Sequence, residues 1–134
     1  MQDQNCIFCK IAKNEIPSKK VYEDEKFVAF LDISPKSKGH ALVIPKDHYE
    51  SFLEMPGELE KEMFALAQKL GRKLKEKLSA KYVFLLVMGV DVPHTHVHLI
   101  PSYEGDSEPY AVQLGPSKKF DLDAVLSELI GGEE

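Results

Sequence analysis

The sequence contains no apolar run approaching the roughly 20 residues that a membrane-spanning helix needs, which excludes a bilayer-spanning protein. Residues 1–5 are polar and do not resemble the start of a signal peptide. Basic residues are also in deficit, with 17 Lys and Arg against 22 Asp and Glu. The resulting formal charge of -5 argues against a broad nucleic-acid-binding face. We therefore expect a cytoplasmic protein that binds neither membrane nor nucleic acid.

Cysteine is scarce as well, and its two copies are spaced as C-x₂-C at Cys6 and Cys9. Without export, such cysteines are expected to be thiols or metal ligands rather than a disulfide. The pair can present two thiolates to one Zn²⁺, which usually takes four N or S ligands. Two purely structural cysteines are the alternative. A redox pair is disfavoured because it should follow a strand of a βαβ unit, and this one precedes every expected strand.

The 134 residues, 43% of them hydrophobic, predict one domain with a substantial core. Apolar runs predict strands at 21–22, 27–31, 40–44, 82–87 and 94–100. The run 82–87 is interpreted as a buried central strand paired antiparallel with 94–100. Together with the helices described next, this indicates an α+β fold: an antiparallel five-stranded sheet with helices on one face.

The predicted long helix follows Pro56-Gly57, and its apolar positions recur every three or four residues. Those positions are Leu59, Met63, Leu66, Ala67, Leu70, Leu74 and Leu78. A short helix after Asp121 is expected within a C-terminal tail, residues 105–134. The tail has too few apolar residues to fold alone, so we expect it to dock on the body, residues 1–104, or on a partner subunit.

Three of the five histidines alternate with Thr95 and Val97 in the segment that holds His94, His96 and His98. On a strand, this spacing places the three imidazoles on one face. Same-face neighbours stand about 6.6 Å apart, which is too wide for one strand to aim all three at a single zinc. A division of roles fits better, with one end histidine joining the cysteines and two acting on substrate. A neutral imidazole is a good nucleophile toward phosphorus.

The run 94–100 resembles the His-x-His-x-His-x-x signature of the histidine triad (HIT) superfamily of nucleotide hydrolases and transferases. Segments 6–11, 15–17, 21–24, 29–35 and 39–48 are similar, in the same order, to the Hint-like branch of that superfamily. The resemblance implies a HIT-like fold for residues 1–104 and a homodimer. It also implies attack on the α-phosphate of a nucleoside phosphoramidate or (di)nucleoside polyphosphate through a nucleotidyl-histidine intermediate, with a purine as the expected base.

The resemblance further implies a role for each site residue. His96 would be the nucleophile, His98 would bind the phosphate oxygens, and His40 would orient the cluster. Asp32 would accept hydrogen bonds from the ribose hydroxyls. Phe8, Ile11, Phe30 and Ile33 would form the apolar slot for the base, although ordinary core is the alternative for Phe30 and Ile33. A structural zinc ion would be held by Cys6, Cys9, His48 and His94.

One segment departs from the Hint pattern. Residues 88–93 form a shorter connection before the triad, and Asp91 falls where the family has a Ser that assists the leaving group. A carboxylate facing phosphate is unfavourable unless it is protonated or turned away. Either Asp91 acts as a general acid with a raised pKa, or this loop contributes little to leaving-group chemistry, and we expect the second. This departure keeps a nucleotide-binding or scaffolding module with little catalysis open as the alternative function, and a nucleotidyltransferase is a second rival.

Overall fold

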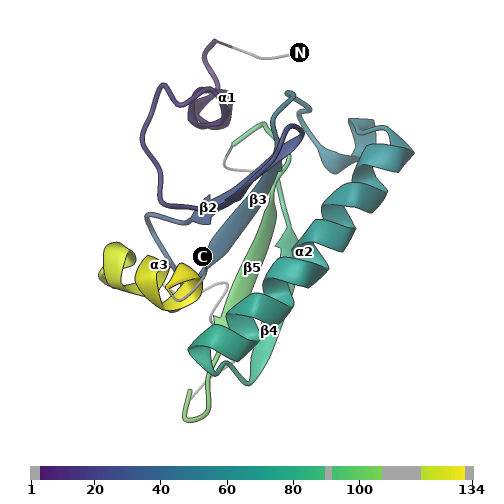
Figure 1. Cartoon of the computed structure of the whole chain (residues 1–134). Coiled ribbons are helices and arrows are strands. Elements are labelled where there is room, and N and C mark those ends of the chain that lie inside the picture. Colours follow the sequence, from purple (N-terminus) through teal and green to yellow (C-terminus); the bar gives the residue numbers. More distant parts are fainter. Residues whose placement is uncertain (1–3, 90–91, 107–118, 132–134) are drawn as a thin grey trace.

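The computed structural model describes residues 4–89, 92–106 and 119–131, which form a five-stranded antiparallel sheet with helices packed on it (Figure 1). The strand order is β1-β2-β3-β5-β4. The strands are β1 (Lys20–Glu23), β2 (Phe27–Leu31), β3 (Ala41–Pro45), β4 (Tyr82–Val87) and β5 (Val97–Ser102). The helices are α1 (Ile7–Ala12), the 3₁₀ turn η1 (Phe52–Glu54), α2 (Gly57–Leu78) and α3 (Leu122–Ile130). The predicted fold class is confirmed.

The long helix α2 begins at Gly57, one residue earlier than predicted, and buries the predicted stripe. Glu58 and Glu60 occupy its first turn, and Lys75 and Lys77 its last, in the sense that favours the helix dipole. It ends at Leu78, and the cap residue Ser79 adopts a left-handed conformation (φ 57°) that lets the following Ala80 N–H also donate to the Lys75 carbonyl at 3.1 Å. Leu59 is partly buried, and six apolar side chains are fully buried: Met63, Leu66, Ala67, Leu70, Leu74 and Leu78.

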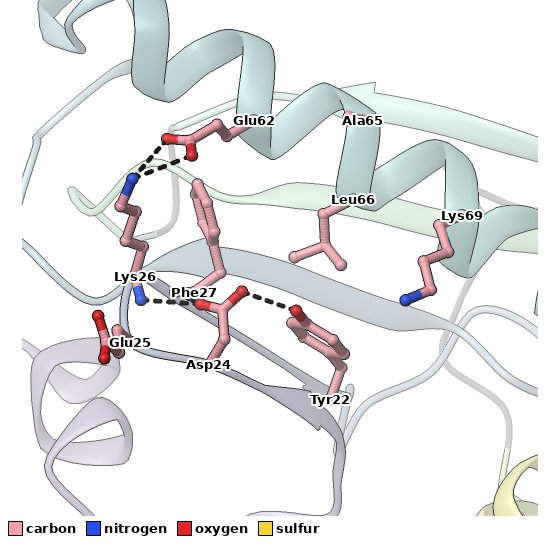
Figure 2. Close-up of a pocket in the computed structure, with 9 residues that line it drawn as sticks. All are labelled: Tyr22, Asp24, Glu25, Lys26, Phe27, Glu62, Ala65, Leu66 and Lys69. Atoms are coloured by element: carbon pink, nitrogen blue, oxygen red, sulfur yellow. Dashed lines mark hydrogen bonds and ion pairs between the residues drawn. The ribbon is translucent and has the colours of Figure 1, made fainter.

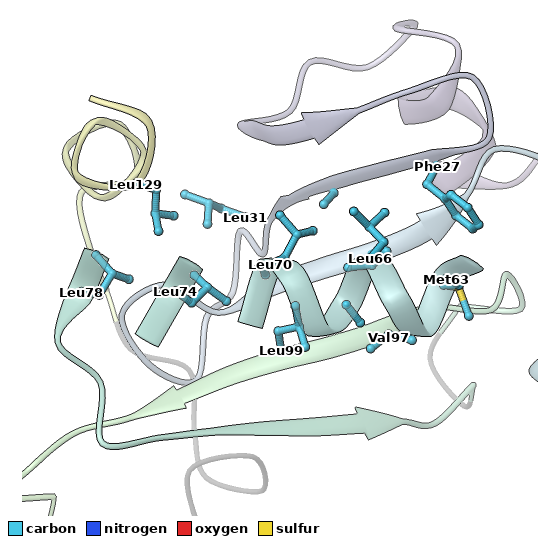
Figure 3. Packing of buried hydrophobic residues seen from close by; sticks show 14 of the residues in the cluster. Phe27, Leu31, Met63, Leu66, Leu70, Leu74, Leu78, Val97, Leu99 and Leu129 are labelled. Atoms are coloured by element: carbon cyan, nitrogen blue, oxygen red, sulfur yellow. The ribbon is translucent and has the colours of Figure 1, made fainter. Parts of the chain in front are cut away.

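Side chains alternate along each strand, so the two faces of the sheet contribute to two different hydrophobic clusters. On β2, Phe27, Ala29 and Leu31 join the cluster beneath α2, which Figure 3 shows from close by. Val28 and Phe30 point the other way and pack with the residues of α1. The prediction that the helices cover one face is therefore wrong, since α1 and α2 lie on opposite faces. Residues of even number on the inner strands belong to the α1 face.

Strand β4 lies at the edge of the sheet and pairs with β5 alone among the described strands, so the predicted central position is wrong. The predicted antiparallel pairing with the histidine segment is confirmed, for example between Leu86 and His98. Tyr82 and Leu85 remain 47% and 44% exposed. An apolar run indicates that a strand is to be covered, but it does not indicate whether a neighbouring strand or another subunit covers it.

Strand β5 begins at Val97, three residues later than predicted. Of the alternating histidines, only His98 therefore lies on the strand itself, while His94 and His96 belong to the segment that leads into it. This segment is nonetheless held to the body, because the Thr95 N–H donates to the Tyr49 carbonyl at 2.7 Å. The three rings therefore do not all follow the side-chain alternation of one strand, and they point in different directions.

Helix α3 begins as predicted at Asp121, whose Oδ1 accepts from the Ala124 N–H at 3.2 Å. Val125 and Leu129 are buried in the cluster beneath α2, and α3 contacts both α2 and β1. None of the helices in the described ranges combines the length and apolar character that crossing a bilayer requires.

Candidate active site and metal centre

A group of four potential metal ligands assembles where α1 meets the entrance to β5. The ligand atoms of Cys6, Cys9, His48 and His94 all lie within 4.8 Å of one another. The Nδ1 atom of His94 is 3.3 Å from Cys6 Sγ and 3.5 Å from Cys9 Sγ, and Cys9 Sγ is 3.3 Å from His48 Nδ1. Tetrahedral zinc bonds to sulfur and nitrogen would place such pairs about 3.5 Å apart. Both the donor set and the spacing fit zinc.

The tautomer of His94 also suits a ligand. Its Nε2 lies 2.8 Å from the Pro45 carbonyl oxygen, which can only accept, so Nε2 carries the proton. The unprotonated Nδ1 then faces the two sulfurs. A ligating histidine held by a backbone carbonyl through its other nitrogen is the usual second-sphere arrangement at metal sites. Burial, only partly offset by the bond to Pro45, lowers the pKa of His94 to about 4 and keeps it neutral.

The middle histidine is oriented by the backbone next to it. His96 is 4% exposed, and its Nδ1 lies 2.8 Å from the carbonyl oxygen of His94. Because a carbonyl cannot donate, Nδ1 carries a proton, and in the neutral imidazole the lone pair is then on Nε2. The His96 ring stands against the His98 ring, with centroids 4.8 Å apart. The neutral ring with its lone pair on Nε2 is the form that a nucleophilic imidazole requires.

A second chain of hydrogen bonds assigns the tautomers of His40 and His98. The Lys36 N–H donates to His40 Nδ1 at 3.0 Å, so the His40 proton is on Nε2. That Nε2 lies 2.9 Å from His98 Nδ1 and therefore donates to it. The proton of His98 is consequently on its own Nε2. Within the triad, His96 thus offers a lone pair and His98 an N–H donor.

The surroundings hold His40 neutral. Burial lowers its pKa, and the nearby positive charge of Lys36 and the neighbouring His96 act in the same direction. The Asp32 carboxylate opposes them, with Oδ2 at 3.5 Å from His40 Nε2. Asp32 also accepts the Ser34 N–H at 2.8 Å through Oδ1. A carboxylate has further lone pairs, so these contacts leave it capacity for a ligand.

The residues expected to bind the base are only partly brought together. Phe8, Ile11 and Phe30 are buried in one apolar cluster on the α1 face. The Phe8 ring meets His96 edge-on at 5.1 Å and Phe30 at 5.7 Å. Ile33, by contrast, is 81% exposed in the loop after β2 and lies outside that cluster. Asp91 lies outside the described residues.

A surface hollow elsewhere has no connection with the histidines (Figure 2). It lies between the β1–β2 turn and α2, and its polar side chains bind one another. The Tyr22 hydroxyl donates to Asp24 at 2.7 Å, and Lys26 donates to both oxygens of Glu62 at 2.9 and 3.0 Å. No predicted site residue lines it, so the histidine cluster is the candidate active site.

Comparison with known proteins agrees with this geometry. The HIT domain family matches residues 13–105. The chain belongs to the HIT family. An uncharacterized HIT-like protein of Methanocaldococcus jannaschii is 48% identical over 130 residues, covering 94% of this chain and 99% of that protein. An adenosine 5'-monophosphoramidase of Saccharomyces cerevisiae is 36% identical over 122 residues, 90% of this chain and 76% of the yeast protein.

Among solved structures, a Zn-bound histidine triad family protein from Mycobacterium smegmatis superposes on this HIT protein with a TM-score of 0.77. The two chains are 32% identical, and the match covers 96% of this chain and 98% of that one. The family resemblance inferred from the sequence is confirmed.

Two orienting groups of this HIT protein were not foreseen from the sequence: the Pro45 carbonyl at His94 and the Lys36 amide at His40. Both are backbone groups, so the identity of the residue that carries them leaves no signal in the sequence. Phe8 was predicted as part of the base slot, but its edge-on contact with His94 at 5.9 Å also places it against the candidate metal ligands.

The lowered pKa of His40 predicts a pH-dependent stability. In the unfolded chain His40 binds its proton with an ordinary pKa near 6.5, whereas in the folded protein burial lowers that pKa. The unfolding free energy should therefore fall as the pH drops below about 6.5. Urea titrations between pH 7.5 and 5 should show a smaller fall in His40→Gln than in the wild type. Equal slopes for the two proteins would contradict the assignment of a neutral, buried His40.

Proposed function

We propose that this protein is a nucleotide hydrolase or nucleotidyltransferase that attacks the α-phosphate of a nucleotide through His96. The observation that carries the proposal is the 2.8 Å contact between His96 Nδ1 and the His94 carbonyl, which leaves the lone pair on Nε2. The yeast monophosphoramidase relative supports a nucleoside phosphoramidate as one substrate class. A dinucleoside polyphosphate presents the same α-phosphorus to the same nitrogen.

The reaction follows from the assigned protons. His96 Nε2 attacks phosphorus and forms a P–N bond, and the leaving group departs with its bonding pair and takes a proton from solvent. The N–H of His98 Nε2 stabilises the phosphoryl oxygens during transfer. Water or an acceptor then attacks phosphorus and releases a proton to solvent, while the P–N bond breaks and its electron pair returns to His96 Nε2. Electrons and protons balance over the cycle without any change of oxidation state.

The proposed nucleotide site continues from the triad. The ribose hydroxyls would bind the Asp32 carboxylate, whose side chain remains 19% exposed beside His40. A purine base would lie against the cluster that contains Phe8, Ile11 and Phe30, with the exposed Ile33 at its margin. A binding module with little catalysis is the second candidate, favoured by Asp91 standing where a family Ser would assist the leaving group.

Replacing His96 tests the mechanism. His96→Ala should lower turnover of adenosine phosphoramidate by at least about a thousandfold, equivalent to about 4 kcal/mol of transition-state stabilisation. His96→Gln is the matched control for packing, since its amide still donates a hydrogen bond but is not nucleophilic; it should be equally inactive. Mass spectrometry of wild-type protein denatured at mildly basic pH during turnover should find an adenylyl group on His96. Turnover by either variant at the wild-type rate would exclude the mechanism.

We also propose that Cys6, Cys9, His48 and His94 hold one structural zinc ion. With four protein ligands the ion would have no open position, so its contribution is to cross-link α1 to the segment that carries His96. The S···N spacings and the neutral His94 support this assignment.

Elemental analysis tests the zinc assignment. Protein purified without chelators should contain one zinc per chain, and Cys9→Ser should lose most of it because one thiolate is removed. His40→Gln is the control, because it removes an imidazole outside the ligand group and should retain the metal. Zinc-free wild type, or a Cys9→Ser protein with full zinc, would contradict the assignment.

A homodimer is proposed through the groove between α2 and the edge strand β4. Phe64, Tyr82 and Leu85 on this surface are 44–47% exposed, and an apolar edge strand left open is prone to pairing.

Light scattering should give twice the chain mass of 15.1 kDa for the wild type. Leu85→Lys should shift the protein to monomer, whereas Leu53→Lys, at an 80% exposed position outside the groove, should not. A monomeric wild type would refute the proposal.

A further inference from the structure

The loop between β2 and β3, residues 32–40, determines which ring nitrogens of His40 and His98 carry protons. Its Lys36 N–H donates to His40 Nδ1 and thereby fixes the proton of His40 on Nε2, the atom that faces His98. The loop closes on itself at both ends, through Asp32 N–H to the His40 carbonyl at 2.9 Å and His40 N–H to the Ser37 carbonyl at 3.2 Å. Loss of the Lys36 contact would therefore remove the constraint that keeps the proton of His40 on Nε2.

The far side of the loop is held by groups distant in sequence. The Tyr103 hydroxyl, just beyond β5, donates to the Lys38 carbonyl at 2.6 Å. The Lys38 ammonium pairs with Glu128 of α3 at 2.8 Å. Gly39 adopts a φ of +88°, and a Cβ there would collide with Leu78 of α2, so the chain can approach α2 this closely only as glycine. Lys38 is thus fixed both by its backbone and by its side chain.

Helix α3 is itself anchored independently of the loop. Val125 and Leu129 anchor it because they are buried in the main core, whereas the ion pair of Asp123 with Lys19, at 2.8 Å, is largely exposed and contributes little. This helix follows the segment that matches the HIT domain family, which ends at residue 105. Burial, reinforced by the charges of Glu128 and Asp106, raises the pKa of Tyr103 and keeps its hydroxyl protonated as a donor.

We propose that Tyr103 and α3 are positioning elements for catalysis: they hold Lys38 so that the Lys36 amide keeps His40, and through it His98, in the reactive tautomer. This extends the proposed function, on which its catalytic consequence rests, by giving the C-terminal helix a part in the active site. Tyr103 and Glu128 touch neither substrate nor triad, and they act through the loop.

The test compares three variants by hydrogen exchange and kinetics. Tyr103→Phe removes the hydroxyl alone and should accelerate exchange of the Lys36 amide roughly fivefold, the effect of losing one neutral hydrogen bond. Its kcat for adenosine phosphoramidate should fall by a similar factor with KM unchanged, because a displaced His98 donor acts in the transition state. Glu128→Gln should change both quantities in the same direction and by less, since its ion pair is partly exposed.

Asp123→Asn is the matched control, because it removes one carboxylate charge and one ion pair from the same helix without touching the loop. It should leave Lys36 exchange and kcat at wild-type values. Wild-type exchange at Lys36 in Tyr103→Phe overturns the proposal, as does faster exchange with unchanged kcat. Should Tyr103→Phe not fold, Glu128→Gln against Asp123→Asn decides alone. A wild type without turnover would refute the proposed function instead, and Lys36 exchange would still test the loop contacts.

Discussion

The hydrogen bond from His96 Nδ1 to the His94 carbonyl is the interaction on which the site depends. In the neutral ring it leaves the lone pair on Nε2, the nitrogen proposed to attack phosphorus, and it does so with a backbone group that cannot change its protonation. This carbonyl belongs to His94, whose ring faces the thiols of Cys6 and Cys9. The orientation of the proposed nucleophile and the geometry of the metal centre are therefore set by one residue.

Because side chains alternate along each strand, one face of the sheet carries the main core and the other faces α1 and carries His98. Residues of odd number on β2, β3 and β5, such as Ala29, Val43 and Leu99, build the core beneath α2. Their even-numbered neighbours face α1 and include His98. Substitution at the triad can accordingly change activity with little change in the main core. Both sets nevertheless share one backbone, and so the rigid core positions the imidazoles.

Periodicity and composition were enough to predict α2, the inner strands and the pairing of β4 with β5. They placed β4 wrongly because an apolar run predicts a buried strand, whereas on this edge strand Leu85 remains 44% exposed. The C-x₂-C pair and alternating histidines indicated the chemistry, and the family resemblance supplied His40 and His48 from distant segments. The contacts made by the Pro45 carbonyl, the Lys36 amide and the Tyr103 hydroxyl could not be predicted, because each depends on how the folded chain juxtaposes backbone groups.

The tautomers of His40, His96 and His98 can be observed directly by ¹⁵N NMR of the imidazole nitrogens at a pH where these three rings are neutral. We expect His96 to carry its proton on Nδ1, while His40 and His98 carry theirs on Nε2. A His96 proton found on Nε2 in the folded protein would contradict this assignment, since the nitrogen proposed to attack phosphorus would then have no lone pair to donate.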